Sequence, residues 1–329
     1  MTGVGARDPG PRTLIVPTHP GVQYHFCRVG LPTYFLGHWD QFQYWRPQPG
    51  NVHNVLPRFE DAQLDHGPEE YARLLDDPAV GFPGRYDLAW LMFNWQFKLF
   101  RERRDIPKLY RVAKVAELER EDWDEVLARP DFTVVSFYPN TVAWLKATYG
   151  VEVPYIPLGL DPETYGGWTG EDATVLSVIH SWRERGWHYA MYTEAAESLP
   201  TLHVDHLDPS KPVYRYEDLQ RAMRRSRVYL HDGEQEYTIT LIEAMMTGMP
   251  LVSFPLPGIE RYVVHGHNGF VARTAAEVRD FCGMLLADEG LARAMGARSR
   301  EMALRDHHED RWRRDWQSVI RRFVETAGA

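Results

Sequence analysis

This chain of 329 residues has few cysteines and no surplus of positive charge, with 37 Lys and Arg against 46 Asp and Glu. Its two cysteines, Cys27 and Cys282, lie far apart, so neither a disulfide framework nor a metal-ligand spacing is visible. The net charge of −9 argues against an extended interface with nucleic acid. No apolar run approaches the roughly 20 residues that span a bilayer, and the N-terminus lacks the apolar core of a signal peptide. We therefore expect a cytoplasmic protein without a transmembrane segment, for which nucleic acid is an improbable partner.

The sequence also lacks a convincing metal-binding motif. Asp122 and Asp124 form an Asp-x-Asp pattern, which binds metal–nucleotide complexes in some enzymes. Here the pattern follows Glu117, Glu119 and Glu121 in a polar stretch with helical character, which is typical of a solvated helix face. We expect neither a bound metal nor a resident cofactor.

Short apolar runs, separated by helical stretches, fill both halves of the chain. Strands are expected at 14–16, 33–36, 52–56, 86–93, 108–112 and 132–137, and again at 175–179, 202–204, 228–230 and 250–254. Strands that alternate with helices indicate a mostly parallel sheet with crossover connections. The length suits two such domains of about 150 residues each. The sequence therefore predicts an α/β fold with two Rossmann-like domains.

A stretch rich in Gly and Pro, from Tyr155 to Gly170, marks the boundary between the halves. We expect four parts, in chain order: a flexible tail at 1–12, a first Rossmann-like domain at 13–156, a second at 157–305 and a C-terminal helix within 306–329. The apolar residues of this helix recur on one face, which should bury against the first domain; they are Trp312, Trp316, Ile320 and Phe323.

The loop and helix between the strands at 228–230 and 250–254 are the most informative segment for function. A helix that begins there exposes backbone N–H groups, which favour a bound anion. Glu243 lies about two turns into that helix, where its carboxylate could accept hydrogen bonds from two ribose hydroxyls. From position alone, a solvated helix carboxylate is an equal alternative.

Five spaced elements in this half resemble the donor domain of retaining glycosyltransferases of family four. They are Glu243-Ala244-Met245, Gly248 with Pro250, Pro257-Gly258, Glu260, and Gly266 with Asn268-Gly269-Phe270-Val271. The resemblance implies the GT-B fold, in which two Rossmann-like domains face each other across a cleft and the last helix crosses back to the first domain. It also implies transfer of a sugar from a nucleoside diphosphate sugar, such as a UDP-sugar, to a hydroxyl-bearing small molecule or glycan, with retention and without a metal.

The same resemblance implies which residues hold the donor sugar. The family carries a glutamate with seven residues between it and the position of Glu243, and Gln235 stands there. A shift of one residue would supply Glu236, which we take as the reader of the sugar hydroxyls, with Gln235 as the competitor. Three residues occupy the places of the family's glycines and become donor-binding candidates: Tyr237, Thr238 and Ile239.

A second loop resembles the family's diphosphate site. Arg185 precedes Gly186 at the place of the usual lysine, His180 replaces the usual arginine, and Arg183 is nearby. Guanidinium groups there would neutralise the diphosphate and stabilise its departure, because negative charge develops on it in the transition state.

The first half carries weaker candidates, of which Gly21 is expected to bind the donor and the others lie on the acceptor side. Gly21 resembles the glycine of the loop that touches the donor phosphate in the family. Asn94, followed by Trp95, stands nearest to the position of a sugar-contacting histidine, and His19 could supply that contact instead.

Three other functions stay open at this point. Gln235 and the missing glycines would also suit a catalytically weak sugar-nucleotide-binding protein or partner subunit. The same fold could serve a sugar-nucleotide epimerase, or an enzyme that glycosylates a nucleic-acid base.

Overall fold

The computed structural model describes residues 10–42, 46–56, 68–113, 118–205, 215–234 and 236–327. The chain divides into two compact units, one formed by Met1–Pro157 with Trp312–Ala329 and the other by Leu158–Arg311. Most of the tail expected at 1–12 lies outside the described residues. Arg12, which belongs to that range, pairs with Asp87 at 2.8 Å.

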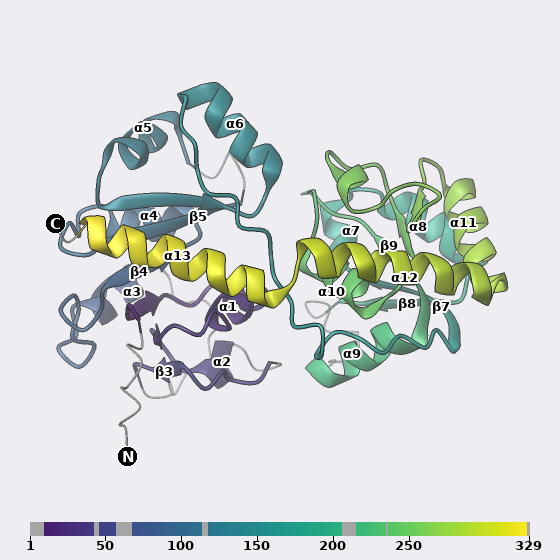
Figure 1. The fold of residues 1–329 in the computed structure, drawn as a ribbon, viewed down its shortest axis with the longest axis horizontal. Helices are drawn as coiled ribbons and strands as arrows, with labels where there is room; N and C mark the ends of the chain where they lie inside the picture. The colour runs from purple at the N-terminus through teal and green to yellow at the C-terminus, as the bar shows by residue number, and fades with distance from the viewer. Residues whose placement is uncertain are drawn as a thin grey trace, which may run out of the picture. The chain divides into compact units, whose positions relative to one another are not determined.

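A six-stranded parallel sheet forms the centre of the first unit, in the order β3-β2-β1-β4-β5-β6 (Figure 1). Its strands are β1 (Thr13–Ile15), β2 (Thr33–Phe35), β3 (Val52–Asn54), β4 (Leu88–Leu91), β5 (Lys108–Val112) and β6 (Phe132–Ser136). Its helices are α1 (Pro20–Cys27), α2 (Trp39–Phe42), α3 (Pro68–Leu75), α4 (Asn94–Phe100), α5 (Arg120–Ala128), α6 (Pro139–Tyr149) and, from Trp312 onward, α13 (Glu309–Ala327). Strands β1 to β3 follow one another outward on one side of the sheet, and β4 to β6 do so on the other side. The neighbouring strands β1 and β4 therefore form the switch point of a doubly wound sheet.

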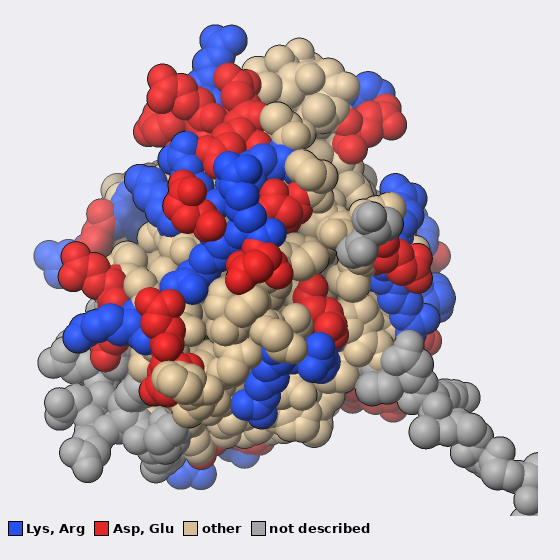
Figure 2. Space-filling view, turned by 90° about the vertical axis from the view of Figure 1, so that its left-hand side faces the viewer, with Lys and Arg blue, Asp and Glu red and all other residues tan. Residues whose placement is uncertain are grey.

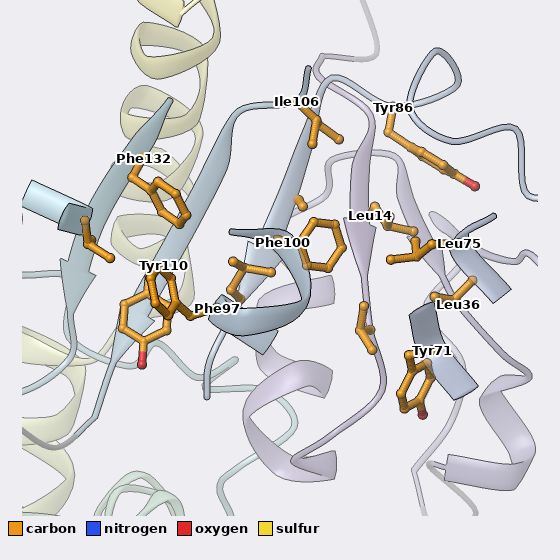
Figure 3. Packing of buried hydrophobic residues seen from close by; sticks show 14 of the residues in the cluster. Leu14, Leu36, Tyr71, Leu75, Tyr86, Phe97, Phe100, Ile106, Tyr110 and Phe132 are labelled. Carbon is orange, nitrogen blue, oxygen red and sulfur yellow. The ribbon is translucent and has the colours of Figure 1, made fainter. Parts of the chain in front are cut away.

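Each face of this sheet is covered by its own apolar layer. Figure 3 shows the layer around Leu14 and Tyr110, to which α4 contributes Phe97 and Phe100. On the other face, Phe26 of α1 stacks on Trp90 with ring centroids 4.5 Å apart. The C-terminal helix belongs to this second layer, because four of its side chains are buried there: Trp312, Trp316, Ile320 and Phe323. The expectation that the last helix packs on the first domain is therefore confirmed.

The second unit contains a five-stranded parallel sheet in the order β11-β10-β9-β7-β8. Its strands are β7 (Asp172–Val178), β8 (Thr201–Val204), β9 (Ser226–His231), β10 (Leu251–Ser253) and β11 (Gly269–Val271). Its helices are α7 (Trp182–Arg185), α8 (Tyr189–Ala196), α9 (Tyr216–Arg225), α10 (Ile239–Thr247), the 3₁₀ helix η2 (Ile259–Arg261), α11 (Ala275–Ala287) and α12 (Glu289–Asp306). The switch point of this sheet lies between β7 and β9. Two Rossmann-like sheets are thus present, and the predicted α/β class is confirmed.

Helix α12 lies very close to the end of α10 at a pair of glycines. A Cβ atom built on Gly296 of α12 would lie 2.1 Å from the carbonyl oxygen of Gly248, which ends α10. The same Cβ would lie 3.4 Å from Cδ of Pro250. A side chain at position 296 therefore has to push the two segments apart.

We expect Gly296→Ala to destabilise the protein by roughly 1–3 kcal/mol, since overpacking a rigid backbone contact forces a shift. Gly283→Ala is the matched control, because Gly283 also lies in a helix but a Cβ there meets nothing within 4 Å. That control should be neutral or more stable by about 0.4–1 kcal/mol, since alanine restricts the unfolded chain. Urea unfolding of the two variants measures the difference, and equal free energies of unfolding would contradict the close approach.

Candidate functional site

Loops at the carboxyl ends of β7, β9 and β10 form the candidate donor site in the second unit. They span residues 179–188, 232–238 and 254–258. In an open parallel sheet, ligands bind beyond the carboxyl ends of the strands, next to the switch point. The β7 and β9 loops flank that switch point. Among the described donor-side residues predicted for this unit, all except Glu243 lie on these two loops and the first turn of α10.

Asp232, directly after β9, fixes the two loops to each other. Its side chain is fully buried. Its Oδ2 accepts hydrogen bonds from Trp182 Nε1 at 2.8 Å and from the backbone N–H of His188 at 3.1 Å. Its Oδ1 lies 2.9 Å from both His188 Nδ1 and the backbone nitrogen of Gly233. One carboxylate therefore binds both ends of the short segment from Trp182 to His188, which carries the two predicted arginines.

The ring of His188 is held in a defined orientation. It stacks on Phe254 with ring centroids 4.6 Å apart and planes 6° apart. Because an ionised carboxylate only accepts hydrogen bonds, Nδ1 of His188 carries the proton toward Asp232. Neither His188 nor Asp232 was predicted from the sequence. The sequence feature that could have identified Asp232 is its position, because it is an acidic residue immediately after a strand that is buried on both faces.

A second carboxylate anchors the other side of the β7 loop. Asp205, just beyond β8, accepts a hydrogen bond from the Ser181 backbone nitrogen at 2.7 Å, and its Oδ1 lies 3.4 Å from His180 Nδ1. Ser181 has a φ of +49°, a conformation that non-glycine residues seldom adopt outside constrained loops. His180 is thereby placed at the carboxyl edge of the sheet, with its side chain 37% exposed.

The two arginines of this loop are exposed. Arg183 and Arg185 both lie in α7, and Gly186 follows with a φ of +73°. The guanidinium of Arg185 lies 5.0 Å from the ring centroid of Trp187. Exposure leaves both cations able to reach a bound phosphate, and their backbone is held through Asp232 and Asp205.

Helix α10 begins beside Asp232. Thr238 is its N-cap residue, with Oγ1 accepting from the Leu241 nitrogen at 3.1 Å, and Ile239 is its first residue. A Cβ on Gly233 would lie 3.2 Å from Cγ2 of Thr238, so the loop after β9 passes close to the start of the helix. The helix N-terminus, where an anion is favoured, is therefore adjacent to the segment that Asp232 fixes.

Glu236, the predicted reader of the sugar, and Tyr237, a donor-binding candidate, are both buried. Glu236 is buried, and its Oε2 accepts a hydrogen bond from Arg261 Nη1 at 2.5 Å. Tyr237 is buried among Tyr262 and His307, and its hydroxyl accepts from the Leu158 nitrogen at 3.4 Å. Gln235, the competitor of Glu236, lies outside the described residues.

Glu243 lies inside a group of tyrosines. It is 1% exposed, and its Oε1 accepts a hydrogen bond from the Tyr165 hydroxyl at 2.9 Å. Tyr165 is hydrogen-bonded in turn to the Tyr216 hydroxyl. The carboxylate is therefore oriented by the segment that follows the domain boundary, and the alternative of a solvated helix carboxylate is excluded.

In the first unit, the acceptor-side candidates lie on the loops after β1 and β4, which flank its switch point. Two buried glutamines connect these loops, since Nε2 of Gln23 and Nε2 of Gln96 donate to the Val16 carbonyl at 2.7 and 3.1 Å. His19 caps α1, with Nδ1 accepting from the Val22 nitrogen at 3.4 Å, and Gly21 is buried in the first turn.

Asn94 and Trp95 begin α4 on the neighbouring loop. Among the residues that the structure describes, the buried Oδ1 of Asn94 has no hydrogen-bond partner. Trp95 stacks on Tyr71, with ring centroids 5.5 Å apart. Asn94 is thus able to take a ligand hydroxyl, whereas the ring of Trp95 is engaged in packing.

Two buried histidines make the second unit sensitive to acid. Burial lowers the pKa of His231 and of His307 to about 4. His231, at the end of β9, has neither ring nitrogen hydrogen-bonded within the described part of the chain, whereas His307 Nδ1 lies 2.7 Å from the Leu158 carbonyl oxygen. Both rings are therefore neutral in the folded protein at pH 7.

Stability should fall as the pH is lowered from about 6.5 to about 4, because the unfolded histidines, with a pKa of about 6.5, then bind protons that the folded ones do not. Each should contribute a loss of roughly 2 kcal/mol between pH 7 and pH 5. His231→Met should remove the part of this loss that His231 causes. His267→Gln, which replaces an exposed histidine, should leave the loss unchanged. Urea unfolding at both pH values measures this effect; identical acid sensitivity of His231→Met and the wild type would contradict it.

Two negative findings concern only the described ranges. They contain no cluster of three or more His, Cys, Asp or Glu side chains arranged to hold a metal ion. No helix among them combines the length and the apolar character that crossing a membrane requires.

Residues 174–318 match a family described as Glycosyl transferase-like. No curated protein matches the chain. Solved structures share its fold over nearly the whole length. HepE from Anabaena, in complex with UDP and glucose, has a TM-score of 0.68 at 13% identity, covering 94% of this chain and 99% of its own. A sucrose-phosphate synthase from Thermosynechococcus elongatus has a TM-score of 0.69 at 14% identity, covering 95% and 98%. A glycosyltransferase from Rickettsia africae has a TM-score of 0.67 at 12% identity, covering 96% and 99%.

These likenesses and the two sheets define the GT-B class. The family match covers residues 174–318, so this part of the chain is similar to group 1-like glycosyltransferases. The resemblance seen in the sequence is confirmed at this level.

Proposed function

We propose that this glycosyltransferase moves a hexose from a UDP-sugar to a hydroxyl-bearing acceptor, with retention of the anomeric configuration. The observation that carries the proposal is the junction of the Asp232-fixed loop with the start of α10. UDP is favoured as the nucleotide because HepE was solved with UDP and glucose, and the pneumococcal transferase GtfA with UDP and GlcNAc.

Each donor residue has a proposed task. The N-terminus of α10, with Thr238 and Ile239, receives the diphosphate together with the side chains of the β7 loop, which are His180, Arg183 and Arg185. Glu243, oriented by Tyr165, accepts from the ribose hydroxyls. Glu236, together with its partner Arg261, binds the hydroxyls of the donor sugar.

The proposed reaction exchanges one bond at the anomeric carbon. The acceptor oxygen attacks from the face that the diphosphate leaves, the bond from the anomeric carbon to the diphosphate oxygen breaks, and that oxygen takes the proton of the acceptor hydroxyl. Guanidinium groups and backbone N–H groups stabilise the charge that develops on the leaving group. We expect the reaction to need no metal ion.

Sugar nucleotides provide the direct test. UDP-, GDP-, ADP- and dTDP-hexoses are compared by thermal unfolding, and the stabilising donor is then assayed for release of free nucleoside diphosphate. A ligand at about 100 times its dissociation constant should stabilise the protein by about 2.7 kcal/mol. Stabilisation by UDP-hexose with slow UDP release supports the proposal. Absence of any response to all four donors overturns it, and a changed sugar without an acceptor would indicate an epimerase.

An enzyme that glycosylates nucleic-acid bases receives no support from the charge pattern. Figure 2 shows one face of the molecule, on which Lys and Arg side chains are interspersed with Asp and Glu. Two arginines of α9 are paired in the same way: Arg225 with Glu171 and Asp172, and Arg221 with Asp218. Paired charges of this kind do not release counterions from a phosphate backbone as a basic stripe would.

A further inference from the structure

Arg111 is a buried cation in an apolar layer of the first unit. It lies in β5 and is 3% exposed. Side chains alternate along a strand, so Arg111 shares the sheet face of Leu109 and not that of Tyr110 and Val112. Phe137, which follows β6, lies on the face of Arg111 and contacts Trp312 of α13, with ring centroids 5.1 Å apart. An arginine in such an apolar layer is unusual, because buried charges are normally paired.

Among the residues that the structure describes, the side chain of Arg111 contacts aromatic rings and makes no hydrogen bond. Its guanidinium carbon lies 4.3 Å from the ring centroid of Phe137 and 5.6 Å from that of Tyr138. Its Nε is buried without a hydrogen bond, and no ion pair joins Arg111 to any residue that the structure describes. Aromatic faces attract a cation but do not use its N–H groups.

Two other cations near the amino end of β5, Lys108 and Arg129, are paired. Lys108, in the same strand, is fully buried and pairs with Asp131. Arg129 is 9% exposed and pairs with Asp131 and with Glu125, both at 2.7 Å. Carboxylates thus pair with the cations at the amino end of β5, whereas no carboxylate of the described ranges pairs with the guanidinium near its carboxyl end.

The guanidinium of Arg111, near the carboxyl end of β5, lies close to the start of helix α6. Arg111 is the penultimate residue of β5 and is aligned with Val135 of β6. Tyr138, beside the guanidinium, is the N-cap residue of α6, an 11-residue helix whose start no side chain caps. A helix N-terminus and an arginine at one corner of a sheet both favour negative charge, and they lie at the edge where Rossmann-like sheets bind ligands.

We infer that Arg111 and the start of α6 form a site for an oxyanion of the acceptor, a phosphate or a carboxylate. The inference rests on the proposed function, in which the first unit takes the acceptor. A guanidinium can bind either oxyanion through two parallel hydrogen bonds, which would satisfy the N–H groups that the protein leaves unused. The transferase would therefore prefer a negatively charged sugar or polyol over a neutral one.

Binding of defined probes tests the site. Glucose, glucose 6-phosphate and glucuronate are titrated by calorimetry into the full chain that has been saturated with UDP, so that the donor half cannot bind the anion. The wild type should bind one or both charged probes and bind glucose more weakly. Arg111→Met should weaken the charged probe about 10- to 100-fold, as expected for loss of a charge-assisted pair, whereas Arg111→Lys should keep part of the affinity.

A matched control and a stability measurement separate this site from a structural role. Arg103→Met removes an arginine that lies 5.1 Å from the Phe82 ring and pairs with exposed Asp76, and it should leave probe binding unchanged. Arg111→Met should keep or raise the melting temperature, because an apolar residue replaces an unpaired buried charge. Equal affinity for glucose and the charged probes, undiminished binding in Arg111→Met, or a marked fall in its melting temperature would overturn the inference. Failure of UDP to bind would instead contradict the proposed donor, and the probes are then titrated without UDP.

Discussion

Asp232→Ala should destabilise the protein by about 3–5 kcal/mol, as expected when one partner is removed from a buried charged network. The loss leaves Trp182 Nε1, His188 Nδ1 and two backbone N–H groups without their acceptor in the folded protein. Donor turnover should fall by about 100-fold or more at temperatures where the variant is still folded, since a shift of about 1 Å in positioning groups can have such an effect. This is the largest effect that we expect from a single residue.

Two comparisons make the result specific. Asp172→Ala removes a carboxylate of the same unit, which pairs with Arg225 at 2.9 Å on the surface, and it should leave the free energy of unfolding nearly unchanged. Asp232→Asn keeps the size of the side chain but places an NH₂ group among hydrogen-bond donors, so it should behave like the alanine variant. Urea unfolding and UDP release measure the two effects. Full stability of Asp232→Asn would contradict the network.

Asp232 also shows where sequence reasoning reached its limit. The alternation of strands and helices, the boundary near Tyr155 and the amphipathic face of the last helix all follow from local composition and periodicity. The partners of Asp232 lie as far as 50 residues away along the chain, at Trp182. Such contacts depend on strand order, and a single sequence does not reveal which strands become neighbours.

Helix α12 was not predicted for a different reason. Its buried positions hold small residues, including Ala292, Gly296 and Ser299, so it has no strong apolar stripe. The helix is stabilised by the close approach of glycines to α10, a property of packing that hydrophobic periodicity does not detect. The same limit applies to Arg111, which the pattern placed in a strand without indicating that its neighbours would be aromatic rings.

Glu243 is the residue for which sequence and structure together give the sharpest test. Its place in the Glu-Ala-Met element made it a candidate for ribose binding, and the structure adds a hydrogen bond from Tyr165 that orients the carboxylate. Glu243→Gln keeps the size of the side chain and an oxygen for Tyr165 but removes the charge. If the carboxylate accepts the ribose hydroxyls, UDP affinity should fall about 10- to 100-fold, because hydrogen bonds to charged groups contribute about 1.5–3 kcal/mol.

The ribose itself provides the control for that prediction. The wild type should bind UDP more tightly than 2′-deoxy-UDP, and Glu243→Gln should lose most of this difference, because the two changes remove the same hydrogen bond. Inorganic pyrophosphate, which has no ribose, should bind the wild type and Glu243→Gln equally. Tyr165→Phe should have an intermediate effect on UDP, since it frees the carboxylate from its orienting hydroxyl without removing the charge. An unchanged preference for UDP over 2′-deoxy-UDP in Glu243→Gln would show that the buried carboxylate serves the tyrosine cluster alone, and the ribose would then be held elsewhere.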